Sequence, residues 1–152
     1  MLIELSSNNL TGYIPSELMS LLELTSLNLS RNQLSGSILE KIGNMKELIS
    51  LDLSVNRLSR ELPMSLSSLH FLSSFNVSFN NLTGRIPTGT QLQSFDESSF
   101  FGNKLCGAPL TETNGCEPVE AATNTIGEKG QVILQSLLIV RSVRRIYRVT
   151  SV

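Results

Sequence analysis

The chain has 152 residues, a length that fits one domain followed by a tail. Apolar residues make up 40% of it and charged residues 16%, and because aromatic residues make up only 5%, with no Trp, the core must be aliphatic. The net charge of −1 gives no reason to expect a nucleic-acid partner. The charge is uneven, because residues 1–116 hold 7 basic and 10 acidic side chains, whereas residues 117–152 hold 5 basic and 3 acidic ones.

Residues 2–95 repeat with a period of 24, which predicts four tandem leucine-rich repeats, the first of them incomplete. The segments LTSLNLSRNQL, LISLDLSVNRL and LSSFNVSFNNL share the pattern L-x-x-L-x-L-x-x-N-x-L. Alternation of apolar and polar residues predicts a short strand in each repeat, near residues 3–6, 25–29, 49–53 and 73–77. We expect these strands to form one parallel sheet on the concave face of a right-handed α/β solenoid.

An asparagine follows each predicted strand, where the chain has to turn. Its amide can both donate and accept hydrogen bonds, so it can satisfy backbone groups of two coils. We therefore predict a buried polar ladder formed by Asn8, Asn32, Asn56 and Asn80. Apolar residues three apart then indicate short helical or 3-10 turns on the convex face.

The first repeat begins without its opening Leu and without an N-terminal cap. Its apolar end should therefore be exposed, which concerns Ile3, Leu5, Leu10, Leu18 and Leu21. We interpret the chain as the C-terminal piece of a longer array. A short array whose end pairs with another molecule is the alternative. No signal peptide is visible at the N-terminus.

The fourth repeat loses its register after Pro87, where a C-terminal cap is predicted over residues 96–116. Large apolar residues in and just before this segment should form a lid over the open core, namely Phe95, Phe100, Phe101, Leu105 and Leu110. Cys106 and Cys116 lie close together in it, and a disulfide between them would add about 2–3 kcal/mol. Two free buried thiols in a reducing compartment are the alternative.

Specific motifs in this region resemble a known family. Leu10–Pro15 and Leu82–Pro87 have the form L-[ST]-G-x-I-P of the plant-type leucine-rich repeat. The run Thr88–Cys116, with GTQL, FGN and LCG, resembles the C-terminal cap of plant receptor-like proteins, cell-surface immune or developmental receptors that lack a kinase domain. The resemblance covers residues 2–116. Leu39 and Arg60 depart from it, because they replace the Pro and the Gly of the repeat.

The resemblance implies the C-terminal part of a receptor ectodomain at the plasma membrane, on its extracellular side. Such receptors bind a protein or peptide ligand and signal through a receptor-kinase co-receptor. Membrane association is implied for the full-length family, but this chain alone does not secure it. The alternative function is that of a secreted structural or enzyme-inhibiting leucine-rich repeat protein.

The tail, residues 117–152, is expected to be disordered or membrane-proximal. Its apolar run, residues 132–140, would span roughly 14 Å as a helix, whereas a bilayer core needs about 30 Å. Basic residues follow it from Arg141 to Arg148, as they follow a membrane helix on the cytoplasmic side. We expect a tail that does not span a bilayer. An amphipathic helix attached to the membrane surface is the alternative.

Candidate sites in the sequence are those of a binding protein. His70 is the only histidine, and no nucleophile, phosphate-binding or metal motif occurs, so we predict no catalytic residue, cofactor or metal and expect no enzyme. Four N-x-S/T sequons predict a glycoprotein, although such sequons also arise from the repeat consensus; they begin at Asn9, Asn28, Asn76 and Asn81.

Three columns of side chains should point outward from the concave sheet. They are Glu4, Asn28, Asp52 and Asn76; Leu2, Ser26, Ser50 and Ser74; and Ser7, Arg31, Val55 and Phe79. As partner contacts we select the side chains that can supply charge, amide hydrogen bonds and apolar area, which are Arg31, Asp52, Asn76 and Phe79. A face that is merely solvated is the alternative.

Overall fold

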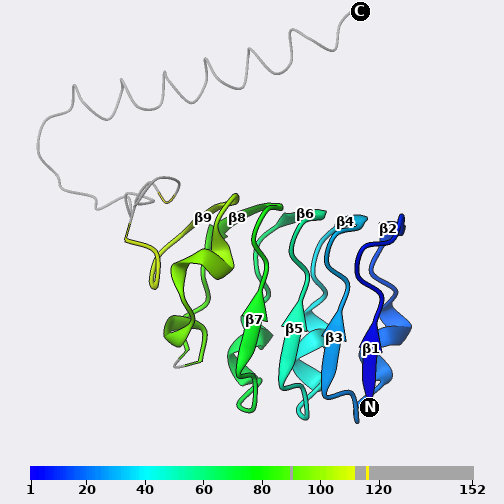
Figure 1. The fold of residues 1–152 in the computed structure, drawn as a ribbon. Helices are drawn as coiled ribbons and strands as arrows, with labels where there is room; N and C mark the ends of the chain where they lie inside the picture. Colours follow the sequence, from blue (N-terminus) through cyan, green and yellow to red (C-terminus); the bar gives the residue numbers. More distant parts are fainter. Residues whose placement is uncertain (90, 112–115, 117–152) are drawn as a thin grey trace, which may run out of the picture. The chain divides into compact units, whose positions relative to one another are not determined.

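Successive coils of the chain each contribute one short strand to a parallel sheet (Figure 1). The computed structural model describes residues 1–89, 91–111 and 116. This first sheet has the order β1 (Leu2–Glu4), β3 (Ser26–Asn28), β5 (Ser50–Asp52) and β7 (Ser74–Asn76). Its central residues pair in register and are Ile3, Leu27, Leu51 and Phe75. The predicted stacking of parallel strands is thus confirmed, although each strand has three residues and the first lies at 2–4 instead of 3–6.

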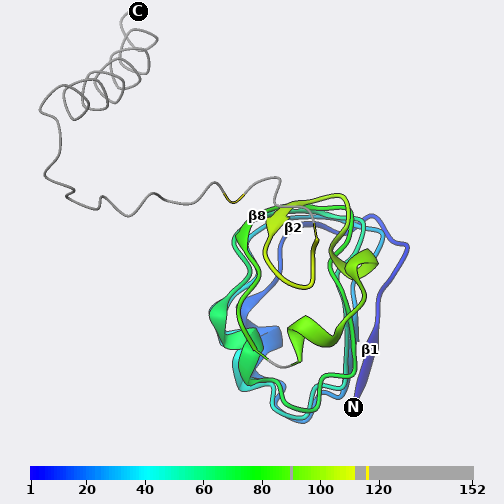
Figure 2. The ribbon, with the colours of Figure 1, turned by 90° about the vertical axis from the view of Figure 1, so that its left-hand side faces the viewer.

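A second parallel sheet, which the repeat pattern did not predict, follows the turn in every coil. Its order is β2 (Thr11–Tyr13), β4 (Gln33–Gly36), β6 (Arg57–Arg60), β8 (Asn81–Arg85) and β9 (Lys104–Cys106). Seen along the solenoid, the coils overlay as one outline in which β1 and β2 lie on adjoining sides (Figure 2).

The second sheet contains a left-handed residue in each coil, and it shows what the Arg60 departure means. The φ angles are +84° at Gly12, +79° at Gly36 and +81° at Gly84, and Arg60 adopts +69° at the equivalent position. An L-residue in this region costs roughly 1–2 kcal/mol, because its Cβ approaches the following carbonyl oxygen. Arg60 therefore keeps the geometry of the turn at an energetic cost that glycine avoids.

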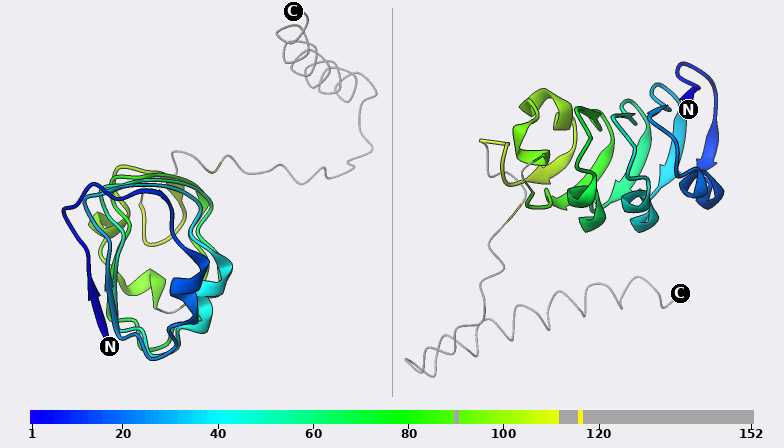
Figure 3. Two further views of the ribbon diagram at one scale, coloured as in Figure 1. Left: turned by 90° about the vertical axis from the view of Figure 1, so that its right-hand side faces the viewer. Right: turned by 90° about the horizontal axis from the view of Figure 1, so that it is seen from below.

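Short 3-10 turns lie on the side of the coils away from the first sheet (Figure 3). They are η1 (Ser16–Ser20), η2 (Glu40–Asn44) and η3 (Met64–Ser68), which confirms the predicted convex turns. The residues before them, Pro15, Leu39 and Pro63, are all extended, with ψ of 134°, 140° and 138°. Leu39 thus takes the conformation that proline imposes elsewhere, so its substitution leaves the turn unchanged.

The core is a continuous aliphatic stack. Leu48, Leu51, Leu53 and Leu58 are each at most 1% exposed. Full burial of such a side chain contributes about 1.5–3 kcal/mol, and only a neighbouring coil can provide that burial. In the first coil Leu5, Leu10 and Leu21 are 44%, 38% and 36% exposed, whereas Ile3 and Leu18 are half-buried against the core.

The asparagine side chains join neighbouring coils by hydrogen bonds. Asn56 Nδ2 donates to the Leu53 and Ser54 carbonyls of its own coil at 3.1 and 3.2 Å. It also donates to the Leu29 carbonyl of the preceding coil at 3.0 Å, and its Oδ1 accepts the Leu34 N–H at 2.9 Å. Asn32 and Asn80 repeat the pattern. No buried side-chain nitrogen or oxygen of the described residues lacks a partner.

A further ladder asparagine, Asn103, lies inside the segment that the sequence analysis assigns to the cap. Its Nδ2 donates to the Val77 and Phe100 carbonyls at 2.9 and 3.0 Å, and its Oδ1 accepts the Leu82 N–H at 3.0 Å. The turn η5 (Glu97–Phe100) stands where a strand would be. The 24-residue period does not predict this role of Asn103, because its step from Asn80 is 23 residues, although the N-x-L signal is present.

Aromatic side chains seal the last coil. The Phe75 ring lies 5.6 Å from that of Phe95 and 5.7 Å from that of Phe100, centroid to centroid. Phe100 is 1% exposed and Leu105 4%, as expected for a lid, whereas Phe101 is 49% exposed. The expectation that Phe101 belongs to the lid is therefore wrong, because its neighbour Phe100 takes the inward position.

Within the described residues, no helix is long and apolar enough to cross a membrane. The apolar run at residues 132–140 and the basic residues after it, with the predictions made for this tail, lie outside that part of the chain.

We predict that Asn56→Ala destabilises the fold by about 2–4 kcal/mol, because it strands several buried backbone groups of two coils at once. Asn8→Ala is the matched control, because exposed Asn8 bonds only the Leu5 and Ser6 carbonyls of its own coil, and its cost should stay below about 1 kcal/mol. Urea unfolding followed by circular dichroism measures both. Equal losses for the two variants would contradict a stabilising role of the inter-coil bonds.

Candidate functional site

One outward column consists entirely of left-handed residues, which stand three positions after the strands of the first sheet end. Ser7, Arg31, Val55 and Phe79 all have a φ of +54°, and each stands directly before the asparagine of its coil, although Asn8 bonds only carbonyls of its own coil. This conformation turns their side chains away from the core, so that Val55 is 43% and Phe79 61% exposed. The column thus presents a cation and apolar groups on neighbouring coils.

Gly102 occupies the same position in the last coil, with a φ of +70°. A Cβ built on it would lie 2.6 Å from Phe79 Cδ1, so the Phe79 ring covers this glycine. The ring is held at one edge and is still largely exposed. The repeat pattern predicts that Phe79 points outward, but it does not predict that the absence of a side chain at Gly102 leaves space for the ring.

The polar residues selected as partner contacts also close the turns. Asp52 Oδ1 accepts the Ser54 N–H at 2.9 Å, and Asn76 Oδ1 accepts the Ser78 N–H at 2.9 Å. Both side chains are half-buried. Such Asx turns fix the backbone ahead of the left-handed residue. Asp52 and Asn76 therefore stabilise the scaffold, whichever groups of a partner they face.

Two carboxylates also accept the N–H of the residue two positions later, namely Glu4 in β1 and Asp96 before η5. Hydrogen bonds from the Ser6 side chain and N–H lower the pKa of the Glu4 carboxyl, and hydrogen bonds from Ser98 lower the pKa of Asp96 in the same way. Both carboxylates are exposed, so these shifts describe local hydrogen bonding and not a reactive group.

The four sequon asparagines fall into two structural classes. Asn9 and Asn81 are exposed, and Thr is the third residue of each sequon. Asn28 and Asn76 are half-buried in strands of the first sheet. Asn28 Nδ2 donates to Glu4 Oε2 at 2.9 Å, and its Oδ1 accepts the Ser30 N–H at 3.0 Å. Its amide is therefore already engaged on both sides.

The two cysteines are joined in the structure. Cys106 is buried in β9, and its Cα lies 5.5 Å from that of Cys116, a usual separation for a disulfide. Because β9 pairs with β8, this bridge ties residue 116 to the last pair of the second sheet.

Groups suited to catalysis do not gather in this part of the chain. His70 is exposed on the convex side, where its carbonyl accepts a hydrogen bond from Gln91 Nε2. No three His, Cys, Asp or Glu side chains among residues 1–89, 91–111 and 116 come together as a metal site.

Comparisons with known proteins agree with this architecture. The family model described as Leucine Rich Repeat matches residues 2–21, 23–45 and 47–69. No curated protein matches the chain. Among solved structures, the BIR2 ectodomain from Arabidopsis thaliana is 44% identical over 71% of this chain and 57% of its own, with a TM-score of 0.67.

Two solved complexes from Arabidopsis are also similar. The BIR3–SERK2 complex is 42% identical, covers 72% of this chain and 58% of the matched chain, and has a TM-score of 0.67. The receptor kinase HAESA, solved with the peptide hormone IDA and the co-receptor SERK1, is 38% identical over 75% of this chain and 19% of its own, with a TM-score of 0.64. The chain thus spans little more than half of the first two structures.

We predict that material passed through the secretory pathway contains a Cys106–Cys116 disulfide. Replacing both cysteines with Ala should cost about 2–3 kcal/mol of stability, because the bridge closes a short loop. Mass spectrometry after non-reducing digestion measures the linkage, because the two cysteine peptides stay joined if the bridge is present. Two free thiols at these positions would reject the bridge.

We predict that glycans attach to Asn9 and Asn81 before Asn28 and Asn76, since only the first two amides are exposed. Enzymatic deglycosylation in heavy-oxygen water converts each glycosylated Asn to labelled Asp. Peptide mapping by mass spectrometry then gives the occupancy of each site. Higher occupancy at Asn28 than at Asn9 would contradict this ranking.

Proposed function

The chain is a leucine-rich repeat protein, and on that premise we propose that it forms the C-terminal part of a cell-surface receptor ectodomain. Its first sheet contacts the ectodomain of a partner receptor kinase, and the receptor signals through that partner. Its place is the extracellular side of the plasma membrane, and its role is recognition and not catalysis.

The class of partner is supported by the proteins that the chain resembles. HAESA was solved with a peptide hormone and a co-receptor, and BIR3 with SERK2, so solenoids of this kind bind other ectodomains and peptides. A protein surface is therefore the expected partner, in keeping with an acidic excess among residues 1–116 that disfavours nucleic acid.

The observation that carries the proposal is the exposed column of the first sheet beside the last coil. Phe79 keeps 61% of its surface exposed while one edge of its ring lies over Gly102, so it offers a large apolar area to a partner. Arg31 lies two coils away, roughly 10 Å at the usual strand spacing. Aromatic and Arg side chains are over-represented among binding hot spots.

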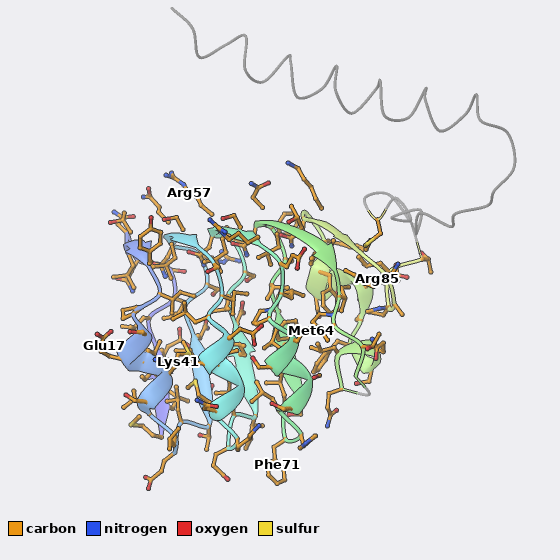
Figure 4. The ribbon with its side chains drawn as sticks, turned by 180° about the vertical axis from the view of Figure 1, so that it is seen from behind. Glu17, Lys41, Arg57, Met64, Phe71 and Arg85 are labelled. Atoms are coloured by element: carbon orange, nitrogen blue, oxygen red, sulfur yellow. A yellow bond between two sulfur atoms is a disulfide. The ribbon has the colours of Figure 1, made fainter. Side chains whose placement is uncertain are left out.

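We predict that Phe79→Ala and Arg31→Ala each weaken partner binding by about 1–2 kcal/mol without unfolding the solenoid, since neither side chain points into the core. Phe71→Ala and Arg57→Ala are the matched controls, because these residues are exposed away from the first sheet (Figure 4). Asp52→Ala and Asn76→Ala should weaken binding and also lower stability, because their turns open.

The measurement is interferometry between the full chain and a co-receptor kinase ectodomain, with circular dichroism as the folding control. Loss of binding in the Phe71 and Arg57 variants alone would place the contact on another side. Unchanged binding of all four first-sheet variants would mean that this face is solvated scaffold.

A further inference from the structure

Arg60 is the one non-glycine in a column that otherwise consists of glycines. Gly12, Gly36, Gly84 and Gly107 all have φ between +79° and +85°, and Arg60 has +69°. Glycine therefore avoids the energetic cost of the left-handed conformation in four coils, whereas Arg60 bears that cost in the fifth. A strained residue that persists among relaxed equivalents is a sign that its side chain has a task.

At this column a large side chain of one coil lies over the glycine of the next coil. The ring of Tyr13 covers Gly36, Glu61 Cγ lies 2.8 Å from a Cβ built on Gly84, and Arg85 Cγ lies 3.2 Å from one built on Gly107. These three glycines thus lie under a large side chain of the preceding coil, whereas nothing lies within 4 Å of a Cβ built on Gly12. In the coil before Arg60 the equivalent residue is Ser37, which is too small to cover its neighbour.

With a small residue at Ser37 and a large one at Arg60, a hollow is left on the flank of the solenoid. Two adjoining hollows, of about 520 and 670 Å³, share Ser37 and Arg60 in their linings. Together they form a groove across the coils, which we call the flank groove, and its principal residues are Tyr13, Ser37, Arg60, Glu61, Met64 and Arg85. Figure 4 shows Met64 and Arg85 on the back of the molecule, with Arg57 at its upper rim.

The chemistry of the flank groove favours a polypeptide. Arg60 and Arg85 are exposed, and a guanidinium binds a carboxylate through two parallel hydrogen bonds. Met64 is 61% exposed and adds apolar area. Glu40 and Glu61 also line the groove, so a uniform polyanion would meet repulsion there, whereas a peptide can alternate carboxylates with apolar side chains.

We propose that the flank groove binds an extended, carboxylate-bearing segment of a partner protein, with Arg60 and Arg85 as its anchors. This surface belongs to the second sheet and the 3-10 turns, so it is separate from the first-sheet contact proposed above. The strain at Arg60 is retained because a glycine there would leave the groove without its central cation.

A phage-displayed library of random heptapeptides, selected on the full chain, tests the proposal. Selected peptides should be enriched in Asp or Glu alternating with apolar residues. In fluorescence polarisation Arg60→Gly should weaken the leading peptide at least tenfold while raising the melting temperature by roughly 4–8 °C, because the strain is relieved. Arg57→Ala is the matched control, since Arg57 lies on the same strand outside both linings, and it should change affinity less than twofold.

A second variant fills the groove without removing stability. Ser37→Tyr combined with Arg60→Gly copies the pairing of Tyr13 with Gly36, so it should fold and fail to bind the peptide. Peptides without acidic enrichment, equal losses for Arg57→Ala and Arg60→Gly, or undiminished binding by the double variant would overturn the proposal. So would tighter binding of a sulfated oligosaccharide of equal charge, which would indicate a polyanion site.

Discussion

The stack of asparagine side chains is the constraint on which the rest of the structure depends. The backbone groups of the turn in each coil are partly or fully removed from water, so they must find hydrogen-bond partners within the protein. Asn56 bonds carbonyls of two coils and accepts an amide of the earlier one. A single side chain thereby fixes both the spacing between two coils and the register in which they stack. The sheets on either side follow, because their strands leave the same fixed turn.

The ladder also explains why the end of the array can differ from its middle. Between Asn80 and Asn103 the step shortens by one residue, and η5 takes the place of a strand. The carbonyls of Ser99 and Phe101 nevertheless accept the N–H groups of Val77 and Phe79, at 2.8 and 2.6 Å. What is preserved is the position of the acceptors and not the secondary structure that presents them.

Features that depend on the residues of a single coil could be predicted from the sequence, whereas features that depend on contacts between two coils could not. The alternation around Leu27 predicted a strand, and the spacing of Leu66 and Leu69 predicted a convex turn. The second sheet was not predicted, because each of its strands β2, β4, β6 and β8 contains a left-handed residue and shows no alternation of apolar and polar residues. For the candidate site, the outward positions of Arg31 and Phe79 could be predicted from the repeat. The turn-closing role of Asp52 had a local signal, a carboxylate two residues before Ser54, whereas the groove at Arg60 depends on the size of a side chain 23 residues earlier.

The pairing of Ser37 with Arg60 limits how freely coils can be exchanged. Repeat proteins are often treated as strings of cassettes that can be duplicated, deleted or grafted. In this array a coil that contains Tyr13 or Glu61 needs a glycine at the covered position of the next coil. The coil that contains Arg60 follows one with a small residue, Ser37, at the covering position. The unit that can be transplanted is therefore the junction between two coils, and a graft cut at the coil boundary would divide that unit.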